Sequence, residues 1–516
     1  MKRIIATVLC AVMTVGLLGG CGSEDKPYIP TGDGLTWDED YTGPTVTTPQ
    51  TDEEQELTLT YYPDRSMNPY ICTDFTNRAL FSLLYQSLFI VDRDYNVEPM
   101  LCKSYSVSED MKTYTFYLED ATFSDGTALT AQDVAASLMA AKNSQIYSGR
   151  LSHVKEIIAG ADGSVAVTLT MAYEDLPLLL DIPVLKQSQQ QLDQPLGTGP
   201  YVLETVDGSA RLRRRTDWWC KADMTVTAQV IALIRAESVT QIRDTFEFDN
   251  LSLVCADPGS DRYADYRCDY ELWDCENNIF LYLACNMDSP VFSVPEIRAA
   301  VTRAIDRDTL VESYYRGFAR SATLPASSLS PYYNQTLASR YSYDGGEALA
   351  KAVAGAQLPA DTVVTVLVNS DDSLRLRVAR TIGTALESCG LTVQMKEVDS
   401  DDYLYALRMK EYDVYVGQTK LSNNMDLSAF FSSNGALSYG GLDDVALYTL
   451  CMEALANHGN YYTLHQSVMD DGRLCPILFR SYAIYATRGL LTGLTPARDS
   501  VFYYSLGKTM EKALIQ

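Results

Sequence analysis

The amino-acid sequence predicts an α/β protein with more than one domain, and three observations indicate this class. Residues 362–416 alternate between predicted strands and helices, an order that produces a parallel sheet with right-handed crossovers. Residues 57–190 mix strands and helices without regular alternation. Roughly 460 of the 516 residues follow the N-terminal segments, which is more than one hydrophobic core normally organises. We therefore expect two or three domains.

The first 21 residues have the pattern of a lipoprotein export signal. Lys2 and Arg3 precede an apolar run, residues 4–18, that is too short to span a bilayer. Small residues then lead to Cys21 in the sequence Leu-Gly-Gly-Cys, which resembles the lipobox of bacterial lipoproteins. In a lipobox the cysteine receives diacylglycerol and becomes the new N-terminus. We expect an extracytoplasmic protein anchored to the cell membrane by lipidation of Cys21; an ordinary secretory signal is the alternative.

Residues 22–56 are predicted to form an acidic tether. Ten Asp and Glu residues accompany the single Lys26, together with four prolines and seven threonines. Such a segment has too little apolar surface to offset the entropy lost on ordering, so we expect it to be disordered. A flexible chain of this length spans about 30 Å, which is enough to hold a folded body close to a bilayer.

The ordered body is predicted to begin with a half-buried strand at residues 57–61, where apolar and polar residues alternate. A helix is expected over residues 74–89. Thr130 and Asp133 have the spacing of a capping box and predict a helix through Ala141. The other elements predicted in this half are a strand at 114–118, a turn at Asp125-Gly126, and a hairpin formed by 154–158 and 165–169.

The second half begins with a continuous β-branched run at residues 362–368, which predicts a strand buried on both faces. An amphipathic helix follows, with Gly390 as its C-terminal stop and one apolar face made of Val378, Ile382, Leu386 and Cys389. The pattern then predicts a strand at 391–398, a helix at 403–410 and a strand at 412–416. Ligands of such sheets bind beyond the carboxyl ends of the strands, which indicates the residues just after Val416.

Composition narrows the classes of partner and cofactor. The net charge of −26 argues against binding to nucleic acid and against electrostatic binding to anionic lipid. No segment after residue 21 approaches the roughly 18 apolar residues of a membrane span. The three histidines, His153, His458 and His465, lack the spacing of a zinc motif. We expect no metal, no cofactor and a monomer.

The cysteines leave the redox state open. Twelve are present, and ten remain when Cys10 of the signal and Cys21 are set aside. Export permits disulfides, and Cys255, Cys268, Cys275 and Cys285 are close enough in sequence for a local bridge. Buried thiols are equally compatible with the sequence.

Five separated parts of the chain carry a more specific signal. They are Met-Asn-Pro-Tyr at 67–70, the stretch 84–89 followed by 97–101, the strand 114–118 followed by 123–134, Gly-Thr-Gly-Pro-Tyr at 197–201, and the run 298–307. Together, and in this order, they resemble family 5 of the extracytoplasmic solute-binding proteins of ABC importers. This family includes dipeptide-, oligopeptide- and nickel-binding proteins. The resemblance extends from about residue 57 to the C-terminus.

The resemblance implies a two-lobed type II periplasmic-binding-protein fold of cluster C, with an extra subdomain inserted in the first lobe. Mapped onto this sequence, the first lobe comprises residues 57–75, 191–275 and 476–516, the insertion residues 76–190, and the second lobe residues 276–475. Such a receptor encloses a small solute between its lobes and delivers it to the permease of an ABC importer. A surface sensor or adhesin that uses the same fold is the alternative function.

An enzymatic function finds little support in the sequence. It lacks a GxSxG elbow, a Walker A loop, an HExxH motif and a Rossmann glycine run. A carboxylate-based hydrolase stays an alternative only because acidic residues are abundant. We expect a binding protein without catalytic residues.

Most of the motif residues also have structural explanations. Gly126, Gly197 and Gly199 are expected to give the backbone freedom at turns. Arg298 and Asp306 are expected to lie on one helical face and to hold that helix through capping and ion pairs.

The segment 417–427 departs from the family where the ligand is expected. Gln418 stands where relatives often have tryptophan. The aspartate that pairs with a peptide amino group in relatives is replaced by one of the residues 421–423, depending on the alignment. Asp426 better matches a later Asp-Pro pair, although the proline is absent. A buried amino group without a carboxylate is costly, so an ordinary peptide becomes a less favoured ligand.

Two basic residues indicate the charge of the ligand. Lys420 adds a cation to this loop, and Arg480 follows an apolar strand where relatives place a tyrosine near the ligand. If both face the cleft, the solute carries a carboxylate, phosphate or other acidic group; an internal ion pair of Arg480 is the alternative. The predicted ligand contacts are Asn68, Gln418, Thr419, Lys420, Asn423, Asp426 and Arg480.

Overall fold

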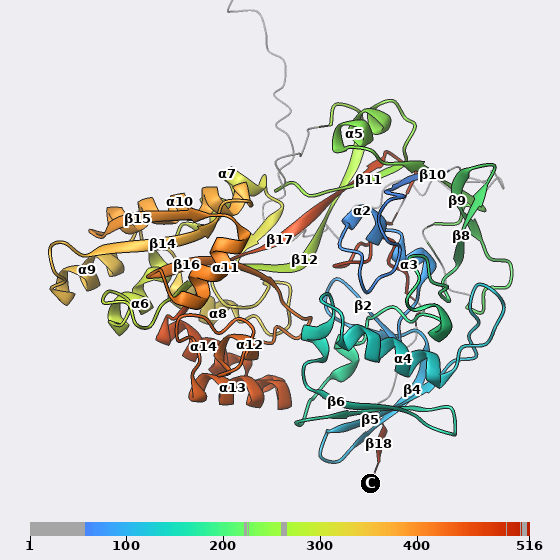
Figure 1. Cartoon of the computed structure of the whole chain (residues 1–516), viewed down its shortest axis with the longest axis horizontal. Coiled ribbons are helices and arrows are strands. Elements are labelled where there is room, and N and C mark those ends of the chain that lie inside the picture. Colours follow the sequence, from blue (N-terminus) through green and yellow to red (C-terminus); the bar gives the residue numbers. More distant parts are fainter. Residues whose placement is uncertain are drawn as a thin grey trace, which may run out of the picture. The chain divides into compact units, whose positions relative to one another are not determined.

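The computed structural model describes residues 57–515, apart from 221–223, 225, 260–265, 492, 506 and 508–512. The predicted export signal with Cys21 and the predicted tether at 22–56 lie outside the described residues. Within the described part, strands form sheets of seven, five, four and two strands, and helices accompany them in a mixed α/β architecture (Figure 1). No helix in this part of the chain is both long enough and apolar enough to cross a membrane.

The first described strand belongs to the four-stranded sheet. β1 (Leu57–Tyr61) lies parallel to β10 (Val230–Arg235), and antiparallel β9 (Ser209–Arg214) and β8 (Tyr201–Val206) complete the order β1-β10-β9-β8. The two leucines of β1 are buried at alternate positions, as expected of a strand with one face on the core. The strand predicted at residues 57–61 is confirmed.

The five-stranded sheet contains the predicted hairpin. β4 (Cys102–Ser108), β5 (Thr113–Leu118), β7 (Val165–Leu169) and β6 (Val154–Ala159) are successive antiparallel neighbours. β18 (Ala513–Ile515) joins the outer edge parallel to β4, so a segment far along the chain returns to this sheet (Figure 1). The predicted strand in β5 and the predicted β6–β7 hairpin are confirmed.

Helix α4 (Ala131–Lys142) begins as the sequence predicts. The Thr130 hydroxyl accepts a hydrogen bond from the Asp133 amide, and the Asp133 carboxylate accepts one from the Thr130 amide at 3.0 Å. This reciprocal capping box satisfies two amides that the helix itself leaves unpaired. The preceding turn is also confirmed: Gly126 has a φ of +80°, which explains glycine at that position.

The largest sheet holds the predicted β-α-β-α-β unit. β14 (Val363–Asn369) lies between β15 (Thr392–Val398) and β16 (Val414–Lys420) and is parallel to both. α10 (Ser373–Ser388) and α11 (Ser400–Met409) form the two crossovers. The predicted parallel order is therefore confirmed.

Two long strands continue this sheet. β12 (Tyr270–Cys285) and β17 (Leu474–Thr487) pair with each other in antiparallel orientation, with register shifts near the middle of β12. β12 also pairs with β16, while β17 also pairs with β11 (Leu253–Ala256) and with β13 (Ala319–Ser321). These two strands therefore join segments that are far apart in the sequence.

The helix predicted over residues 74–89 is wrong. The segment forms two short helices, α2 (Phe75–Arg78) and α3 (Phe81–Leu84), and then becomes extended before β2 (Phe89–Val91). β2 pairs with β3 (Val97–Pro99) to form the two-stranded sheet. Nearly every side chain of α3 and its flanks is buried, so the apolar pattern does not distinguish one helical face or set a helix length.

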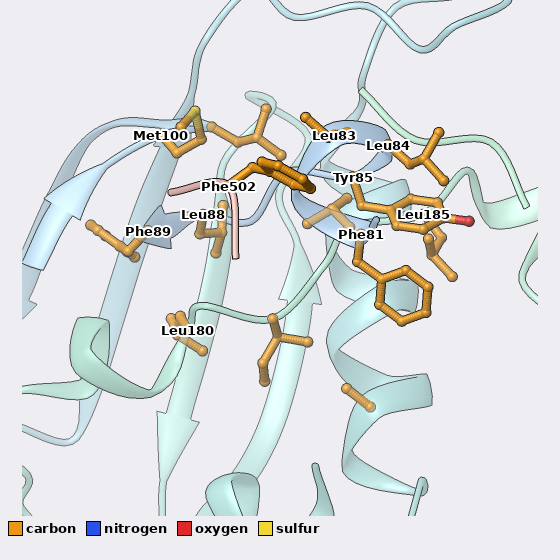
Figure 2. Packing of buried hydrophobic residues seen from close by; sticks show 14 of the residues in the cluster. Phe81, Leu83, Leu84, Tyr85, Leu88, Phe89, Met100, Leu180, Leu185 and Phe502 are labelled. Atoms are coloured by element: carbon orange, nitrogen blue, oxygen red, sulfur yellow. The ribbon is translucent and has the colours of Figure 1, made fainter. Parts of the chain in front are cut away.

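The core around α3 gathers side chains from distant parts of the chain (Figure 2). It includes Phe81, Leu88, Met100, Leu180 and Phe502. The presence of Phe502 means that the segment near the C-terminus returns to the first half of the chain. The residues just before Phe502 are thereby held close to α2 and α3.

Gly197 and Gly199 serve close packing, which differs from the predicted role in turns. Neither has a positive φ. A Cβ atom added to Gly199 would lie 2.5 Å from the carbonyl oxygen of Leu83, and the Gly199 amide donates a hydrogen bond of 3.0 Å to the carbonyl of Leu84. Glycine is therefore required because two backbones approach each other.

Arg298 and Asp306 belong to different helices, so the expectation of one shared helical face is wrong. α6 (Pro295–Val301) contains Arg298, which donates to the carbonyl of Phe292 at 2.8 Å. Asp306 caps α7 (Arg307–Tyr315) as expected of a capping residue. The remaining α-helices in the described ranges are α5 (Val239–Glu247), α8 (Gln335–Ala338), α9 (Glu347–Ala356), α12 (Ser428–Phe431), α13 (Val445–Ala456) and α14 (Tyr461–Asp471).

Candidate functional site

Strand β16 continues four residues past Val416, where the sequence predicts its end, and stops at Lys420. Its ladder with β12 pairs Gln418 with Leu281 and Lys420 with Ile279. Because β12 continues alongside, the backbone of residues 417–420 stays in the sheet. The loop expected to meet the ligand therefore begins only after Lys420.

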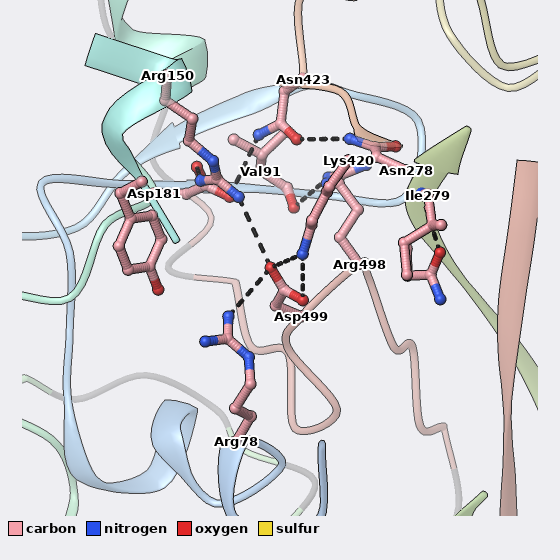
Figure 3. Close-up of polar contacts among 12 residues, drawn as sticks. Arg78, Val91, Arg150, Asp181, Asn278, Ile279, Lys420, Asn423, Arg498 and Asp499 are labelled. Atoms are coloured by element: carbon pink, nitrogen blue, oxygen red, sulfur yellow. Dashed lines mark hydrogen bonds and ion pairs between the residues drawn. The ribbon is translucent and has the colours of Figure 1, made fainter. Parts of the chain in front are cut away.

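Lys420 ends this strand beside Asp499, 79 residues later in the chain (Figure 3). The Nζ atom of Lys420 lies 2.7 and 2.6 Å from the two carboxylate oxygens of Asp499. The Lys420 side chain is 33% exposed and that of Asp499 is 23% exposed, so the pair is partly open to solvent. The lysine predicted to face the ligand already has an internal counter-charge.

Two more cations converge on the same carboxylate (Figure 3). A guanidinium nitrogen of Arg78 lies 3.3 Å from Asp499 Oδ2, and one of Arg150 lies 3.7 Å away. Burial alone would raise the pKa of the Asp499 carboxyl, but Lys420, Arg78 and Arg150 hold it well below its usual range. Burial also lowers the pKa of the Lys420 ammonium, and Asp499 opposes that change.

A second carboxylate, Asp181, completes the arrangement. It forms an ion pair with Arg150 and accepts a hydrogen bond of 3.2 Å from the Asn423 amide nitrogen. Asn423 also donates to the carbonyl of Leu178 and accepts from Asn278, both at 3.0 Å, so its side chain is fully used by protein contacts. We refer to the charged residues together as the ion cluster: Arg78, Arg150, Asp181, Lys420 and Asp499.

Two other predicted ligand contacts lie outside the ion cluster. Asp426 accepts a hydrogen bond of 2.8 Å from the Ser428 amide, and its other oxygen lies 3.4 Å from His153 Nε2. The buried Asn68 donates hydrogen bonds of 2.8 and 3.0 Å to the carbonyls of residues 190 and 192. The structure thus gives Asn68 and Asp426 partners within the protein.

Arg480 lies on β17 and is almost completely buried. Its guanidinium pairs with Asp257 and donates a hydrogen bond of 3.1 Å to the side-chain oxygen of Gln418. Thr419 is half-buried beside Gln418 on β16. Of the two possibilities that the sequence leaves open for Arg480, the structure contains the internal ion pair.

A small cavity opens beside the ion cluster. Its volume is about 100 Å³, and its charged wall is formed by Arg78, Asp181 and Asp499. Ser500 and Tyr147 add hydroxyl groups to its lining. The lining also includes the apolar side chains of Phe81, Ile90, Val91 and Met100. The arrangement is therefore suited to a small charged group attached to an apolar part.

Sequence reasoning missed Arg78, Arg150, Asp181 and Asp499. One of them carried a usable signal, because Asp181 is a single charged residue within an otherwise apolar stretch. Asp499 carried none, since its cationic partners are distant in the sequence. No group of three or more His, Cys, Asp or Glu side chains is arranged to hold a metal in the part of the chain that the structure describes.

Comparison with protein families identifies the chain's relatives. The family described as bacterial extracellular solute-binding proteins, family 5 (middle), matches residues 96–438. The glutathione-binding protein GsiB of Salmonella typhi is 27% identical over 285 residues, which cover 50% of this chain and 53% of that protein. The match spans about half the length of this curated relative.

Solved structures show where the fold recurs. The ABC transporter substrate-binding protein CtaP of Listeria monocytogenes has a TM-score of 0.71 at 19% identity, covering 87% of this chain and 98% of that one. AgaA from A. tumefaciens, solved with agropinic acid, has a TM-score of 0.64 at 18% identity, covering 88% and 99%. These similarities confirm the predicted α/β fold of the type II periplasmic binding proteins, and the named relatives are binding proteins, not enzymes. Since the family match covers more than half of the sequence, the chain belongs to family 5 of the bacterial extracellular solute-binding proteins.

Proposed function

We propose that this protein is the receptor of an ABC importer and that it captures a small polar solute, peptide-like or acidic, for delivery to the permease. The observation that carries the proposal is the ion cluster beside a cavity. There the end of β16 meets residues from the first half of the chain and from the segment near the C-terminus. Membership of the family supports the same function.

The proposed receptor has two lobes, with the boundaries that the sequence indicates. Residues 57–75, 191–275 and 476–516 form the first lobe, 76–190 its insertion, and 276–475 the second lobe. A solute then favours the closed form only to the extent that it binds that form more tightly than the open one. Contacts such as Lys420 to Asp499 are the kind of interaction that closure forms.

The chemistry of the relatives' ligands supports a solute that carries carboxylates. The curated relative is named for glutathione, and one of the solved structures holds agropinic acid. Both molecules bear carboxylate groups, which the cations of the ion cluster would attract. Residues 417–425 offer no carboxylate to an α-amino group, and Asp181 and Asp499 are already paired with cations, so a solute recognised mainly through its amine is disfavoured.

A thermal-shift screen tests this function on protein lacking residues 1–21. The panel should contain glutathione, short peptides, dicarboxylates, sugars and metal chelates. A tight solute raises the melting midpoint by mass action, by about 2.7 kcal/mol of stability at a hundredfold excess over Kd. Stoichiometric binding without turnover supports a receptor. Turnover of the bound compound, or no stabilisation by any class, contradicts it.

Two further parts of the proposal need their own tests. Anchoring at the cell membrane through Cys21 predicts that radiolabelled palmitate is incorporated into the full chain and that Cys21→Ser abolishes incorporation. Delivery to a permease predicts that the loaded receptor stimulates the ATPase activity of the cognate transporter. A receptor that binds solute without stimulating any transporter would favour the sensor.

A further inference from the structure

We propose that Arg78, Arg150 and Lys420 form a binding site for a carboxylate group of the solute, and that Asp499 is an internal carboxylate that occupies this site before the solute arrives. The inference rests on the proposed function, because it assigns a ligand class to the same site. None of Arg78, Arg150 and Asp499 belongs to the contacts predicted from the sequence.

The balance of charge favours an anion at this site. The ion cluster contains three cations and two carboxylates. Asp181 is held by Arg150 and by the amide of Asn423, so Asp499 is the carboxylate that serves all three cations. Replacing it with another anion preserves the pairing, whereas an amine placed there would face like charges.

The two arginines of the site are held more firmly than the carboxylate. The Arg78 guanidinium donates a hydrogen bond of 3.1 Å to the Cys72 carbonyl, and Arg150 packs 5.3 Å from the centre of the Tyr147 ring. Their side chains are only 8% and 9% exposed. Within the described residues, the Asp499 carboxylate contacts only the three cations. The two arginines are therefore preorganised, and the Asp499 carboxylate is the part of the site that can leave.

The position of Asp499 gives a solute a route to the cations. Asp499 lies in a tight turn closed by two backbone hydrogen bonds between Ala497 and Ser500, of 2.9 and 2.8 Å. Both Asp499 and Ser500 line the cavity of about 100 Å³, together with Arg78. A carboxylate in this cavity would therefore lie next to Arg78 and Asp499, and rotation of the Asp499 side chain would open the way to Arg150 and Lys420.

Lys420 connects the carboxylate site to β16. It is the one cation of the ion cluster that comes from β16, and it contributes the shortest contacts to Asp499. A solute carboxylate that replaces Asp499 keeps a link between β16 and α2, with the solute now in the middle. Loss of the Lys420 ammonium group removes this link between β16 and α2 for any solute that binds through its carboxylate.

The test uses two probes of equal carbon number and opposite charge, glutarate and 1,5-diaminopentane, on protein lacking residues 1–21. Isothermal titration is expected to show weak binding of glutarate to the wild type and no binding of the diamine. Asp499→Asn should bind glutarate about tenfold more tightly or better, because an internal competitor that fills the site in most molecules is gone. Lys420→Gln should weaken glutarate binding at least tenfold. The Lys420 side chain is partly exposed, so we expect this variant to fold.

A matched control separates competition from a general loss of charge. Asp274 is 24% exposed and pairs with Arg93 and Arg320, so Asp274→Asn removes a comparable carboxylate away from the cavity. It should leave glutarate binding unchanged. Melting curves identify any variant that fails to fold; if Asp499→Asn does not fold, the Lys420→Gln result alone decides.

Three results would overturn the proposal. They are glutarate binding that Asp499→Asn leaves unchanged or weakens, diamine binding that depends on Asp499, and wild-type glutarate affinity in Lys420→Gln. If the solute screen finds a ligand but Asp499→Asn leaves the glutarate affinity unchanged, the receptor function is supported and the carboxylate site is contradicted. If the screen finds no ligand but Asp499→Asn binds glutarate more tightly than the wild type, the carboxylate site is supported and the receptor function is contradicted.

Discussion

The Nη2 atom of Arg480 donates hydrogen bonds of 2.9 and 2.6 Å to the two carboxylate oxygens of Asp257, 223 residues earlier in the chain. The pair joins β17 to the segment just after β11 in the largest sheet. Burial disfavours a charged guanidinium that has no partner. The Asp257 carboxylate offsets this cost and stabilises the charged Arg480 side chain.

Replacing Asp257 with Ala should therefore destabilise the protein by about 2 kcal/mol, less than the roughly 3–5 kcal/mol for a fully buried pair because the Asp257 side chain is 35% exposed. Urea unfolding measures the change. The matched control is Asp269→Ala, which removes the exposed partner of Arg488 and should cost less than about 1 kcal/mol. Equal effects of the two substitutions would contradict the role assigned to Arg480.

The glycines of the Gly-Thr-Gly-Pro-Tyr motif give a second prediction. Gly199→Ala should destabilise the protein by about 2 kcal/mol or more, because the added Cβ meets the backbone of Leu83 and Leu84, which cannot move aside without disturbing α3. Gly149→Ala is the matched control, since a Cβ there meets no atom within 4 Å. It should be neutral or slightly stabilising, because alanine restricts the unfolded chain. Similar denaturation midpoints for the two variants would rule out the packing explanation.

The sequence predicts the fold well where a pattern has one structural solution. The β-branched run of β14 and the capping box of α4 each specify an element locally, and both elements form as expected. The single helix predicted over residues 74–89 is wrong because the stretch is buried on nearly all sides. Its apolar residues therefore follow no period from which the end of a helix can be inferred. The turn role predicted for Gly199 is wrong for a related reason. The backbone that approaches this glycine belongs to a segment more than a hundred residues away in the sequence.

The candidate site is predicted only in part, and the reason is again distance in sequence. The expectation that functional residues follow Val416 draws attention to Lys420, which the structure places at the carboxyl end of β16 instead of in a loop. The partner of Lys420 lies 79 residues later, in a segment without a regular element. A charge pattern in one sequence indicates that a buried cation needs a counter-charge, but it does not indicate which carboxylate supplies it.

The cysteines allow a prediction about the redox state that the sequence leaves open. No disulfide joins any two cysteines in the described part of the chain. Most of these thiols are buried, and burial raises the pKa of Cys102 to about 12 and that of Cys268 above its ordinary value. Protein lacking residues 1–21 should therefore titrate ten thiols with DTNB in guanidinium, but far fewer in the native state.

Cys268→Ser provides the control for the thiol count. Cys268 is half-buried, so the substitution should remove one thiol in guanidinium and also lower the native reactivity. A count of eight that rises to ten only after reduction would instead reveal a disulfide.

His465 makes the stability of the protein depend on pH. The ring lies wholly buried in α14, and neither nitrogen has a hydrogen-bond partner in the described part of the chain. Burial lowers the pKa of His465 from 6.5 to about 3, so the folded protein keeps the ring neutral while the unfolded chain takes up a proton below pH 6.5. Stability contributed by the neutral ring is therefore complete above pH 6.5 and falls as the pH drops toward 3.

The comparison that isolates this effect is between the wild type and His465→Leu. Between pH 7.5 and pH 5 the wild type should lose about 2 kcal/mol more unfolding free energy than the variant, since each pH unit below 6.5 costs up to about 1.4 kcal/mol. Urea unfolding at a series of pH values measures the difference in slope, so a uniform change in stability from the altered packing does not affect it. Parallel pH profiles for the two proteins would mean that His465 takes up its proton in the folded state as readily as in the unfolded chain.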